Sequence, residues 1–159
     1  MKQVLDLLRR EARLSPREIA DRLGISEPAA AAAVRKLEDD GVIVGYQALV
    51  RPDKADDGRL TGIIEVKVTP ERNRGFDAIA RRIYEFPEVK LCYLVSGGYD
   101  LLVFVEGDSL RDVADFVAEK LATLEHVTST TTHFILRKYK ESGVKLVDSA
   151  AADRLPVSP

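Results

Sequence analysis

The second half of the chain contains a short turn whose residues can bind a small ligand: Ser96, Gly97, Gly98, Tyr99 and Asp100. The two glycines permit positive backbone angles and leave backbone N–H groups open to a ligand carboxylate. The carboxylate of Asp100 can receive an ammonium group, and the ring of Tyr99 can form a pocket wall. The same residue types also suit a plain hairpin turn in which Asp100 bonds its own backbone. The turn alone leaves both interpretations open.

The first half contains a pattern typical of a helix-turn-helix, a motif that seats its second helix in the major groove of DNA. Ser15 can cap the first of these helices, with Glu18 at the position that completes a capping box. Gly24 then ends this helix in a left-handed conformation. Ser26 caps the second helix, which stops at Gly41. The buried face of this second helix is expected to contain Ala30, Val34 and Leu37. An ordinary helical hairpin in a protein core is the alternative.

The charge balance leaves neither half of the chain strongly basic. Of 159 residues, 45% are hydrophobic and 31% are charged, with a formal net charge of -2. Residues 1–54 carry ten Lys or Arg and nine Asp or Glu, so even the half with the helix-turn-helix is nearly neutral. Because affinity for DNA depends on cations that neutralise phosphates, each copy is expected to bind DNA weakly. This balance favours several copies acting together.

The sequence indicates no catalytic or metal site. It has no serine–histidine–aspartate spacing and no phosphate-binding glycine loop, and its histidines, His126 and His133, flank or lie within the last predicted strand. The single cysteine, Cys92, excludes an internal disulfide and a multi-cysteine metal site, and its apolar surroundings predict a buried thiol. We therefore expect no enzyme activity, no metal and no cofactor. Charges from Lys2 onward and the lack of a long apolar run predict a cytoplasmic protein.

The elements that position the DNA-binding pattern lie in residues 1–50. A helix over about residues 2–13 and the two helices above form a three-helix unit. Residues 41–50, GVIVGYQALV, are rich in strand-forming residues and predict a strand that resembles the wing or exit strand of winged DNA-binding domains. The polar stretch 51–59 contains a proline and a glycine and predicts a hinge linker, where we place the domain boundary.

Beyond this hinge, strand-like and helix-like periods alternate. Strands are predicted over residues 60–69, 89–96, 100–106 and 127–139, and helices around residues 76–83 and 110–121. The order strand, helix, strand, strand, helix, strand is typical of a ferredoxin-like domain, with two helices on one face of a four-stranded antiparallel sheet. The sequence therefore predicts an α+β protein in which a winged helix-turn-helix precedes a ferredoxin-like βαββαβ domain at 60–140. The tail, 141–159, is expected to be disordered or loosely docked.

The predicted sheet is apolar on both faces, although two helices can cover only one of them. The strand LLVFV at residues 101–105 is apolar throughout, and Leu91, Tyr93 and Val95 lie opposite Cys92 and Leu94. Exposure of such a face invites aggregation, so something apolar is expected to cover it. The simplest cover is the same face of a second copy, which gives a two-fold dimer. A dimer of DNA-binding units predicts a pseudo-palindromic operator.

Both halves together resemble the Lrp/AsnC, or feast/famine, family of bacterial and archaeal transcription regulators over about residues 3–140. The first half carries the resemblance in EARLSPREIADRLGIS, in the spacing from Ser26 to Leu37 and in LEDDGVIVGY; the second half carries it in VSGGYDLLVFVEGDS and the threonine-rich last strand. The resemblance implies that the second domain drives dimerisation, assembly of dimers into tetramers or octamers, and binding of a small effector, often an amino acid, between dimers.

The resemblance makes residues 26–36 the recognition helix. The family commonly has polar and basic residues where this chain has alanines at 31–33, so base discrimination is expected to be weak, with DNA shape supplying much of it. Alanine still packs against a thymine methyl, while arginine and lysine late in the helix reach phosphates. The alanines equally suit a strong helix former. The candidate DNA-binding residues are Arg13, Arg22, Ser26, Glu27, Ala31, Arg35 and Lys36.

The turn at residues 96–100 resembles the effector loop of the family, with its glycine-x-tyrosine-aspartate pattern. Thr130 and Thr132 alternate to one face of the last strand and resemble positions that line the same cleft from a neighbouring dimer. Threonine is also a good strand former, so the pair is explained equally well by effector binding or by strand propensity alone. The resemblance makes all seven of these residues candidates for effector binding.

Two other functions are compatible with this architecture. Haem-pathway decarboxylases resemble the family in both domains and have a degenerate DNA-binding half, which the alanine-filled helix would suit. The second half of this chain, however, has no histidine- and arginine-rich segment for a tetrapyrrole. The other alternative is a ligand-sensing assembly module that has lost DNA binding.

Overall fold

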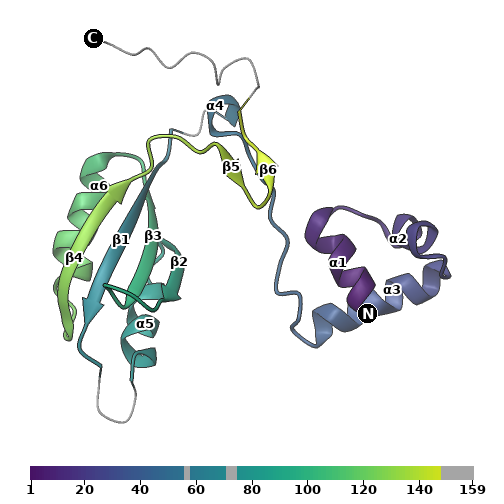
Figure 1. Cartoon of the computed structure of the whole chain (residues 1–159), viewed down its shortest axis with the longest axis horizontal. Coiled ribbons are helices and arrows are strands. Elements are labelled where there is room, and N and C mark those ends of the chain that lie inside the picture. The colour runs from purple at the N-terminus through teal and green to yellow at the C-terminus, as the bar shows by residue number, and fades with distance from the viewer. Residues whose placement is uncertain (56–57, 71–74, 148–159) are drawn as a thin grey trace. The chain divides into compact units, whose positions relative to one another are not determined.

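The computed structural model describes residues 1–55, 58–70 and 75–147 (Figure 1). The chain divides into two compact units, Met1–Leu49 and Val50–Pro159, each with its own hydrophobic core. None of the helices in the described ranges is long and apolar enough to cross a membrane. Residues 148–159, which make up most of the predicted tail, lie outside the described residues.

The first unit contains the three predicted helices. They are α1 (Lys2–Arg10), α2 (Pro16–Leu23) and α3 (Glu27–Asp39). Apolar residues spaced three or four apart on these helices meet in one core, which consists of Val4, Leu8, Ile19, Ala20, Ala30 and Leu37. The first helix ends before the predicted residue 13, because the backbone of Glu11 leaves the helical region with φ -137° and ψ 82°.

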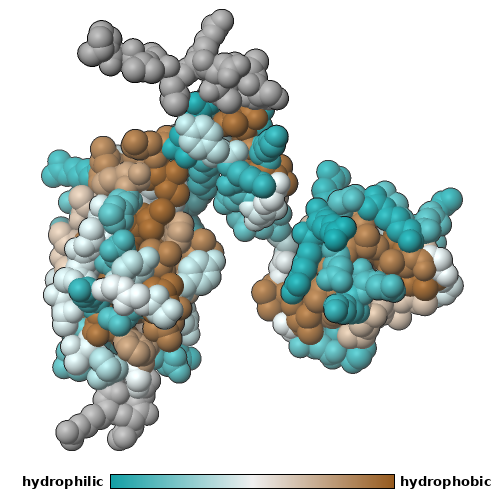
Figure 2. Space-filling model, viewed as in Figure 1, coloured by the Kyte–Doolittle hydropathy of each residue, from teal (hydrophilic) through white to brown (hydrophobic). Residues whose placement is uncertain are grey.

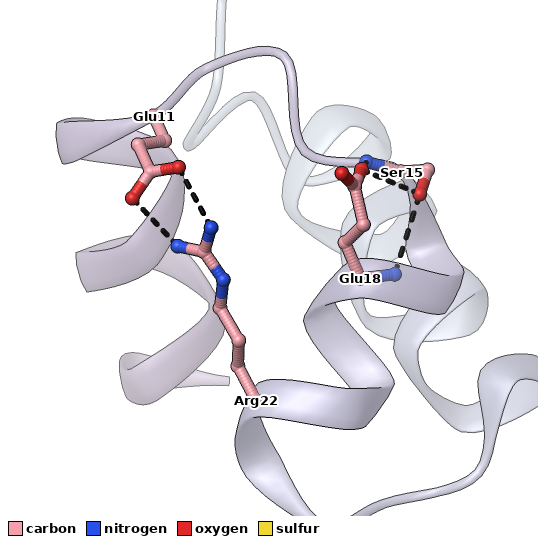
Figure 3. Close-up of polar contacts among 4 residues, drawn as sticks. All are labelled: Glu11, Ser15, Glu18 and Arg22. Atoms are coloured by element: carbon pink, nitrogen blue, oxygen red, sulfur yellow. Dashed lines mark hydrogen bonds and ion pairs between the residues drawn. The ribbon is translucent and has the colours of Figure 1, made fainter.

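The ends of α2 and α3 are set by the capping residues that the sequence predicts. The Ser15 hydroxyl accepts a hydrogen bond from the backbone N–H of Glu18, whose carboxylate accepts one from the Ser15 N–H, so the capping box is complete (Figure 3). Gly24 follows in the left-handed conformation with φ 65°. The Ser26 hydroxyl accepts from the N–H of Ala29 and caps α3. The helix-turn-helix is therefore bounded by local hydrogen bonds.

The strand predicted over residues 41–50 is not formed. After Gly41 the segment has neither helix nor strand, and the strand pairings among the described residues do not include it. The Tyr46 hydroxyl instead donates a hydrogen bond to the Glu38 carboxylate at 2.9 Å, and Val44 is 95% exposed. A strand needs a partner for its backbone groups, and an alternating apolar pattern does not supply one.

The second unit contains the predicted ferredoxin-like domain. Its elements are β1 (Leu60–Val68), α5 (Asp77–Tyr84), β2 (Val89–Leu94), β3 (Leu101–Gly107), α6 (Leu110–Asp115), the π-helix η1 (Phe116–Leu121) and β4 (Val127–Phe134). The four strands form an antiparallel sheet in the order β2-β3-β1-β4. This is the βαββαβ arrangement, with α6 and η1 together in place of one second helix.

The helices pack on one face of this sheet. Alternate residues of β1 and β3 are buried there against α5, α6 and η1, and the core includes Ile64, Val66, Leu101, Val103, Ile79, Ile83, Val113 and Leu121. Gly62 of β1 lies at the closest approach of a helix. A Cβ atom at this position would lie 2.8 Å from Cγ1 of Val113 and 3.3 Å from Cγ2 of Val105. The packing therefore requires glycine here.

Two segments of the second unit differ from the predictions. A short helix, α4 (Pro52–Ala55), forms within the stretch predicted as a hinge, where a proline suits the first turn of a helix. The last strand ends at Phe134 and does not continue to residue 139. The N–H of Ile135 still donates to the carbonyl of Thr61, near the start of β1. The pairing of β4 with β1 ends at this point because β1 begins at Leu60.

A small hairpin follows β4, at the boundary between the predicted ferredoxin-like domain and the predicted tail. It consists of β5 (Lys140–Glu141) and β6 (Val144–Lys145). Leu146, directly after β6, is only 3% exposed. A single buried leucine anchors the segment. Because one apolar residue produces no periodic pattern in the sequence, the hairpin was not predicted.

Candidate DNA-binding surface and ligand-binding turn

The exposed side of α3 is small and apolar in its first half and charged in its second half. Its early exposed residues include Pro28, Ala29 and Ala32, whereas Arg35 and Lys36 are exposed near its end. Alanine and proline side chains carry no hydrogen-bonding groups for base edges. The helix therefore presents charge for phosphates and little for reading bases by hydrogen bonds.

Three predicted DNA-binding residues lie at or near the start of α3. The hydroxyl of Ser26 is already an acceptor for the Ala29 N–H at 3.3 Å, so it serves as the helix cap. Glu27 is exposed in the first turn, where a carboxylate suits the positive end of the helix dipole. Ala31 is half-buried at the edge of the exposed side. These three residues lie together at one end of the helix.

Arg22 is held by an ion pair within the first unit. Its guanidinium donates two hydrogen bonds to the carboxylate of Glu11, at 2.6 and 2.8 Å (Figure 3). The hydrogen bonds from Arg22 hold the pKa of Glu11 below its usual value, and those to Glu11 raise the pKa of Arg22. The pair joins the end of α1 to α2. The sequence could not assign Glu11 as the partner, since eleven positions separate the two residues.

The remaining cations of this surface differ in their contacts. Lys36 forms an ion pair with Asp40, one helical turn later, at 2.9 Å. Arg13 and Arg35 are exposed and form no ion pair within the described ranges. Exposed side chains of this kind can reach phosphates without first breaking a contact. Arg13 and Arg35 are therefore the predicted phosphate contacts that the structure leaves most accessible.

The turn at residues 96–100 connects β2 to β3 and is closed by the Val95 N–H, which donates to the Asp100 carbonyl at 2.9 Å, while the side chain of Asp100 bonds a neighbouring strand. Oδ2 of Asp100 accepts a hydrogen bond from the N–H of Val68 at 2.9 Å, and the Asp100 N–H donates to the carbonyl of Val66 at 3.1 Å. The pairing of β1 with β4 shifts its register between Lys67 and Val68. Asp100 thus satisfies a backbone donor where the ladder is irregular.

The rest of the turn is open. Ser96, Gly97 and Gly98 are exposed, and a Cβ atom at either glycine would meet nothing within 4 Å. Tyr99 is half-buried beside them. The structure therefore leaves room for a ligand over the glycines, as the sequence interpretation of this turn requires.

The two threonines lie on another strand of the sheet. Thr130 pairs with Val66 and Thr132 with Ile64, so their side chains lie on the helix-covered face and are half-buried. The strand β1 separates the two threonines from β3, and Asp100 directly precedes the first residue of β3, Leu101. Two strand spacings amount to about 10 Å. Within one chain, the threonines and the turn do not form one continuous set of contacts.

The second face of the sheet is apolar over β2 and β3 and has no cover in the single chain, whereas Glu65 and Lys67 of β1 and Thr131 and His133 of β4 make the other half of this face polar. Leu91 is 42% exposed and Tyr93 49% exposed, and the ring of Tyr93 packs edge-on against Phe104 with centroids 6.4 Å apart. Figure 2 shows apolar side chains, in brown, at the surface of the unit that holds the sheet. On the polar half of the face, Nε2 of His133 lies 3.3 Å from a carboxylate oxygen of Glu65.

A shallow groove lies at the other end of the sheet from the turn. Its lining consists of Arg59, Pro87, Glu88, Lys90, Glu106, Gly107 and Asp108. Lys120 forms an ion pair with Glu88 and its hydrogen bond lowers the pKa of that carboxyl. Among the described residues, no cluster of histidine, cysteine, aspartate or glutamate is suited to hold a metal ion. Burial raises the pKa of the half-buried Cys92 thiol, in keeping with its apolar surroundings.

The fold defines a two-domain protein in which a helix-turn-helix precedes a ferredoxin-like domain. Residues 1–44 match the winged helix-turn-helix DNA-binding domain, and residues 61–144 match the Lrp/AsnC ligand binding domain. The chain therefore belongs to the Lrp/AsnC family of transcription regulators. It carries a helix-turn-helix DNA-binding domain and an effector-binding domain.

Individual relatives agree with this assignment. The chain is similar to the uncharacterized HTH-type transcriptional regulator YugG of Bacillus subtilis, with 45% identity over 99% of this chain and 95% of the relative. Its fold is similar to that of the leucine response regulatory protein LrpA of Mycobacterium tuberculosis, with a TM-score of 0.73, 25% identity and coverage of 92% and 97%. It is also similar to the transcriptional regulator NMB0573 of Neisseria meningitidis in complex with L-Met, with a TM-score of 0.70, 24% identity and coverage of 91% and 93%.

Proposed function

We propose that the protein binds a pseudo-palindromic operator as a two-fold dimer, and that an amino acid bound at the turn 96–100 changes this binding. The observation that carries the dimer is the apolar part of the sheet, over β2 and β3, on the face that the helices leave uncovered. Burial of this face against the same face of a second copy removes apolar surface from water. Each dimer then holds two helix-turn-helix units, which match the two half-sites of a symmetric operator.

The recognition helix in this proposal is α3, and its contacts are mainly with phosphates. Arg35 and Lys36 in its last turns, together with Arg13, neutralise phosphates and set the position of the protein. The alanines supply contacts to thymine methyl groups, so the shape of the DNA contributes much of the specificity. The role of Arg22 is to hold α1 against α2 through Glu11.

The proposed effector site uses the open backbone of the turn and the carboxylate of Asp100. A carboxylate has about four lone-pair positions, so its bond to the Val68 N–H leaves acceptor capacity for a ligand ammonium. Gly97 and Gly98 give a ligand carboxylate access to backbone N–H groups. Thr130 and Thr132 complete the cleft from a neighbouring dimer in a tetramer or octamer. The L-Met complex of the related fold from Neisseria meningitidis supports an amino acid as the ligand class.

The assembly and the operator are tested together. Analytical ultracentrifugation of the full chain at micromolar concentration is expected to give a dimer or a multiple of it. A DNA fragment with two inverted half-sites, found by selection from random DNA, is expected to bind more tightly than a fragment with one. A monomeric mass contradicts the dimer, and equal affinity for both fragments contradicts the symmetric operator.

The effector site is tested by thermal shift with each of the twenty amino acids, because only a ligand that favours the folded state raises the melting point. Gly98→Leu places a side chain in the open space over the turn and is expected to abolish the shift given by the wild-type ligand. Ala118→Leu, on the exposed side of η1, is the matched control and should respond as the wild type does. A full response in Gly98→Leu shows that the ligand binds elsewhere. Asp100 is less suitable for this test because its replacement also breaks the bond to Val68.

A further inference from the structure

The hairpin of β5 and β6 is basic, although it belongs to an acidic unit. Residues 137–145 carry four Lys or Arg and one Asp or Glu, whereas the remainder of the unit Val50–Pro159 carries twelve and seventeen. The first unit, Met1–Leu49, holds eight of each and is formally neutral. The unit that carries the recognition helix therefore supplies no net positive charge, while a segment of the other unit does.

The geometry of the hairpin directs two of these cations outward. Its turn has two residues with positive φ, Ser142 at 45° and Gly143 at 85°, as in a type I′ turn. Lys140 pairs directly with Lys145, so their side chains share one face of the hairpin. Leu146, the next residue, lies on the opposite face because side chains alternate along a strand. Since Leu146 is 3% exposed and both lysines are exposed, the buried leucine anchors one face and the lysines occupy the other.

The two lysines face each other without a counter-charge. Like charges directly opposite one another destabilise a pair of strands. The nearby carboxylate of Glu141 instead pairs with Lys138, at 3.6 Å. The guanidinium of Arg137 lies 5.2 Å from the ring centre of Tyr139, and this contact does not neutralise the positive charge of Arg137. Lys140 and Lys145 form no ion pair within the described part of the chain. An anion between their ammonium groups would remove the repulsion.

We propose that Lys140 and Lys145 bind phosphates of the DNA backbone, as a second contact, independent of base sequence, with the DNA that the helix-turn-helix binds. The inference rests on the DNA binding proposed above. A polyanion fits the observations because the hairpin presents fixed, exposed positive charge, and because the unit with the recognition helix is neutral and gains affinity from cations elsewhere in the chain. The acidic surface of a second copy is the competing partner, and the experiment distinguishes the two.

The test compares the salt dependence of DNA binding by the full chain and its variants. Replacement of both lysines, Lys140→Gln with Lys145→Gln, is expected to lower the slope of log affinity against log salt by about 1.8 per subunit, at about 0.9 per phosphate. Between 50 and 200 mM salt, this corresponds to roughly a tenfold smaller loss of affinity per subunit than in the wild type. The reduction should be the same for operator and unrelated DNA, because phosphate contacts carry no sequence information.

Two further variants serve as controls. Lys90→Gln with Arg111→Gln removes the same formal charge from exposed positions of the same unit and should leave the slope unchanged. Lys140→Arg with Lys145→Arg keeps the charge and should retain the wild-type slope. The melting point of Lys140→Gln with Lys145→Gln should equal or exceed that of the wild type, since the substitution removes a repulsion.

Three outcomes overturn the inference. An unchanged slope in Lys140→Gln with Lys145→Gln, while the wild type binds DNA, refutes the hairpin contact and leaves the proposed function intact. An unchanged slope together with a lower assembly mass identifies a second copy as the partner. A wild-type protein that does not bind DNA refutes the proposed function itself, and the hairpin contact with it.

Discussion

Gly62 offers a quantitative test of how tightly the sheet and α6 are packed. An alanine Cβ at this position would lie 2.8 Å from Cγ1 of Val113 and 3.3 Å from Cγ2 of Val105, whereas contacting carbons prefer about 3.5–4.0 Å. Both valines are 1% exposed and cannot move into solvent. Overpacking of this kind destabilises by about 1–3 kcal/mol, and the restricted unfolded chain of alanine offsets about 0.4–1 kcal/mol. We expect Gly62→Ala to lower the free energy of unfolding by about 1–2 kcal/mol.

The assay is thermal unfolding of the full chain, monitored by differential scanning calorimetry. For a domain of about 100 residues, each kcal/mol lowers the melting temperature by about 4–8 °C, so Gly62→Ala should melt about 5–15 °C lower. Gly98→Ala is the matched control, because a Cβ there meets nothing within 4 Å. Val113→Ala combined with Gly62→Ala should destabilise less than the sum of the two single changes. A Gly62→Ala protein that melts at or above the wild-type temperature would refute the close approach.

Three further predictions concern the first unit and the open sheet face. Arg22→Gln should lower the melting temperature at neutral pH, because Arg22 holds the pKa of Glu11 below 4.5. This stabilisation exists above pH 4.5 and is lost as the pH falls through the lowered pKa, so the melting temperatures of the two proteins should converge in acid. Ser26→Ala should cost the first unit about 1 kcal/mol, measured by urea unfolding, and a change below 0.3 would contradict its role as a cap. Tyr93→Asp should lower the sedimenting mass to that of a monomer, and a retained dimer would exclude this face as the interface.

The sequence predicted most of the fold because the relevant signals are local. The capping box of Ser15 and the left-handed Gly24 bound α2 without any tertiary information. The alternating pattern of β1 identified a strand with one buried face, which includes Val66. Signals of this kind are written within a few consecutive residues.

Features that depend on distant partners escaped prediction. The segment 41–50 has the composition of a strand but no strand to pair with. Arg22 was predicted to bind DNA, but the fold places the carboxylate of Glu11 beside it. The contact of Asp100 with Val68 joins residues thirty-two positions apart, and neither residue type nor spacing indicates it. The individual residues that bind the effector and the DNA remain predictions, since their contacts require a ligand, DNA or a second copy.

The bond between Asp100 and the Val68 N–H makes one amide of β1 a reporter for the turn. In the proposed site, a ligand ammonium that shares the Asp100 carboxylate with this N–H draws negative charge away from it and so weakens the bond. The amide lies where the pairing of β1 with β4 changes register, so a weakened bond is not compensated by a regular ladder. The rate at which the Val68 amide hydrogen exchanges with solvent should therefore rise when a ligand binds the turn, although the ligand need not touch this amide.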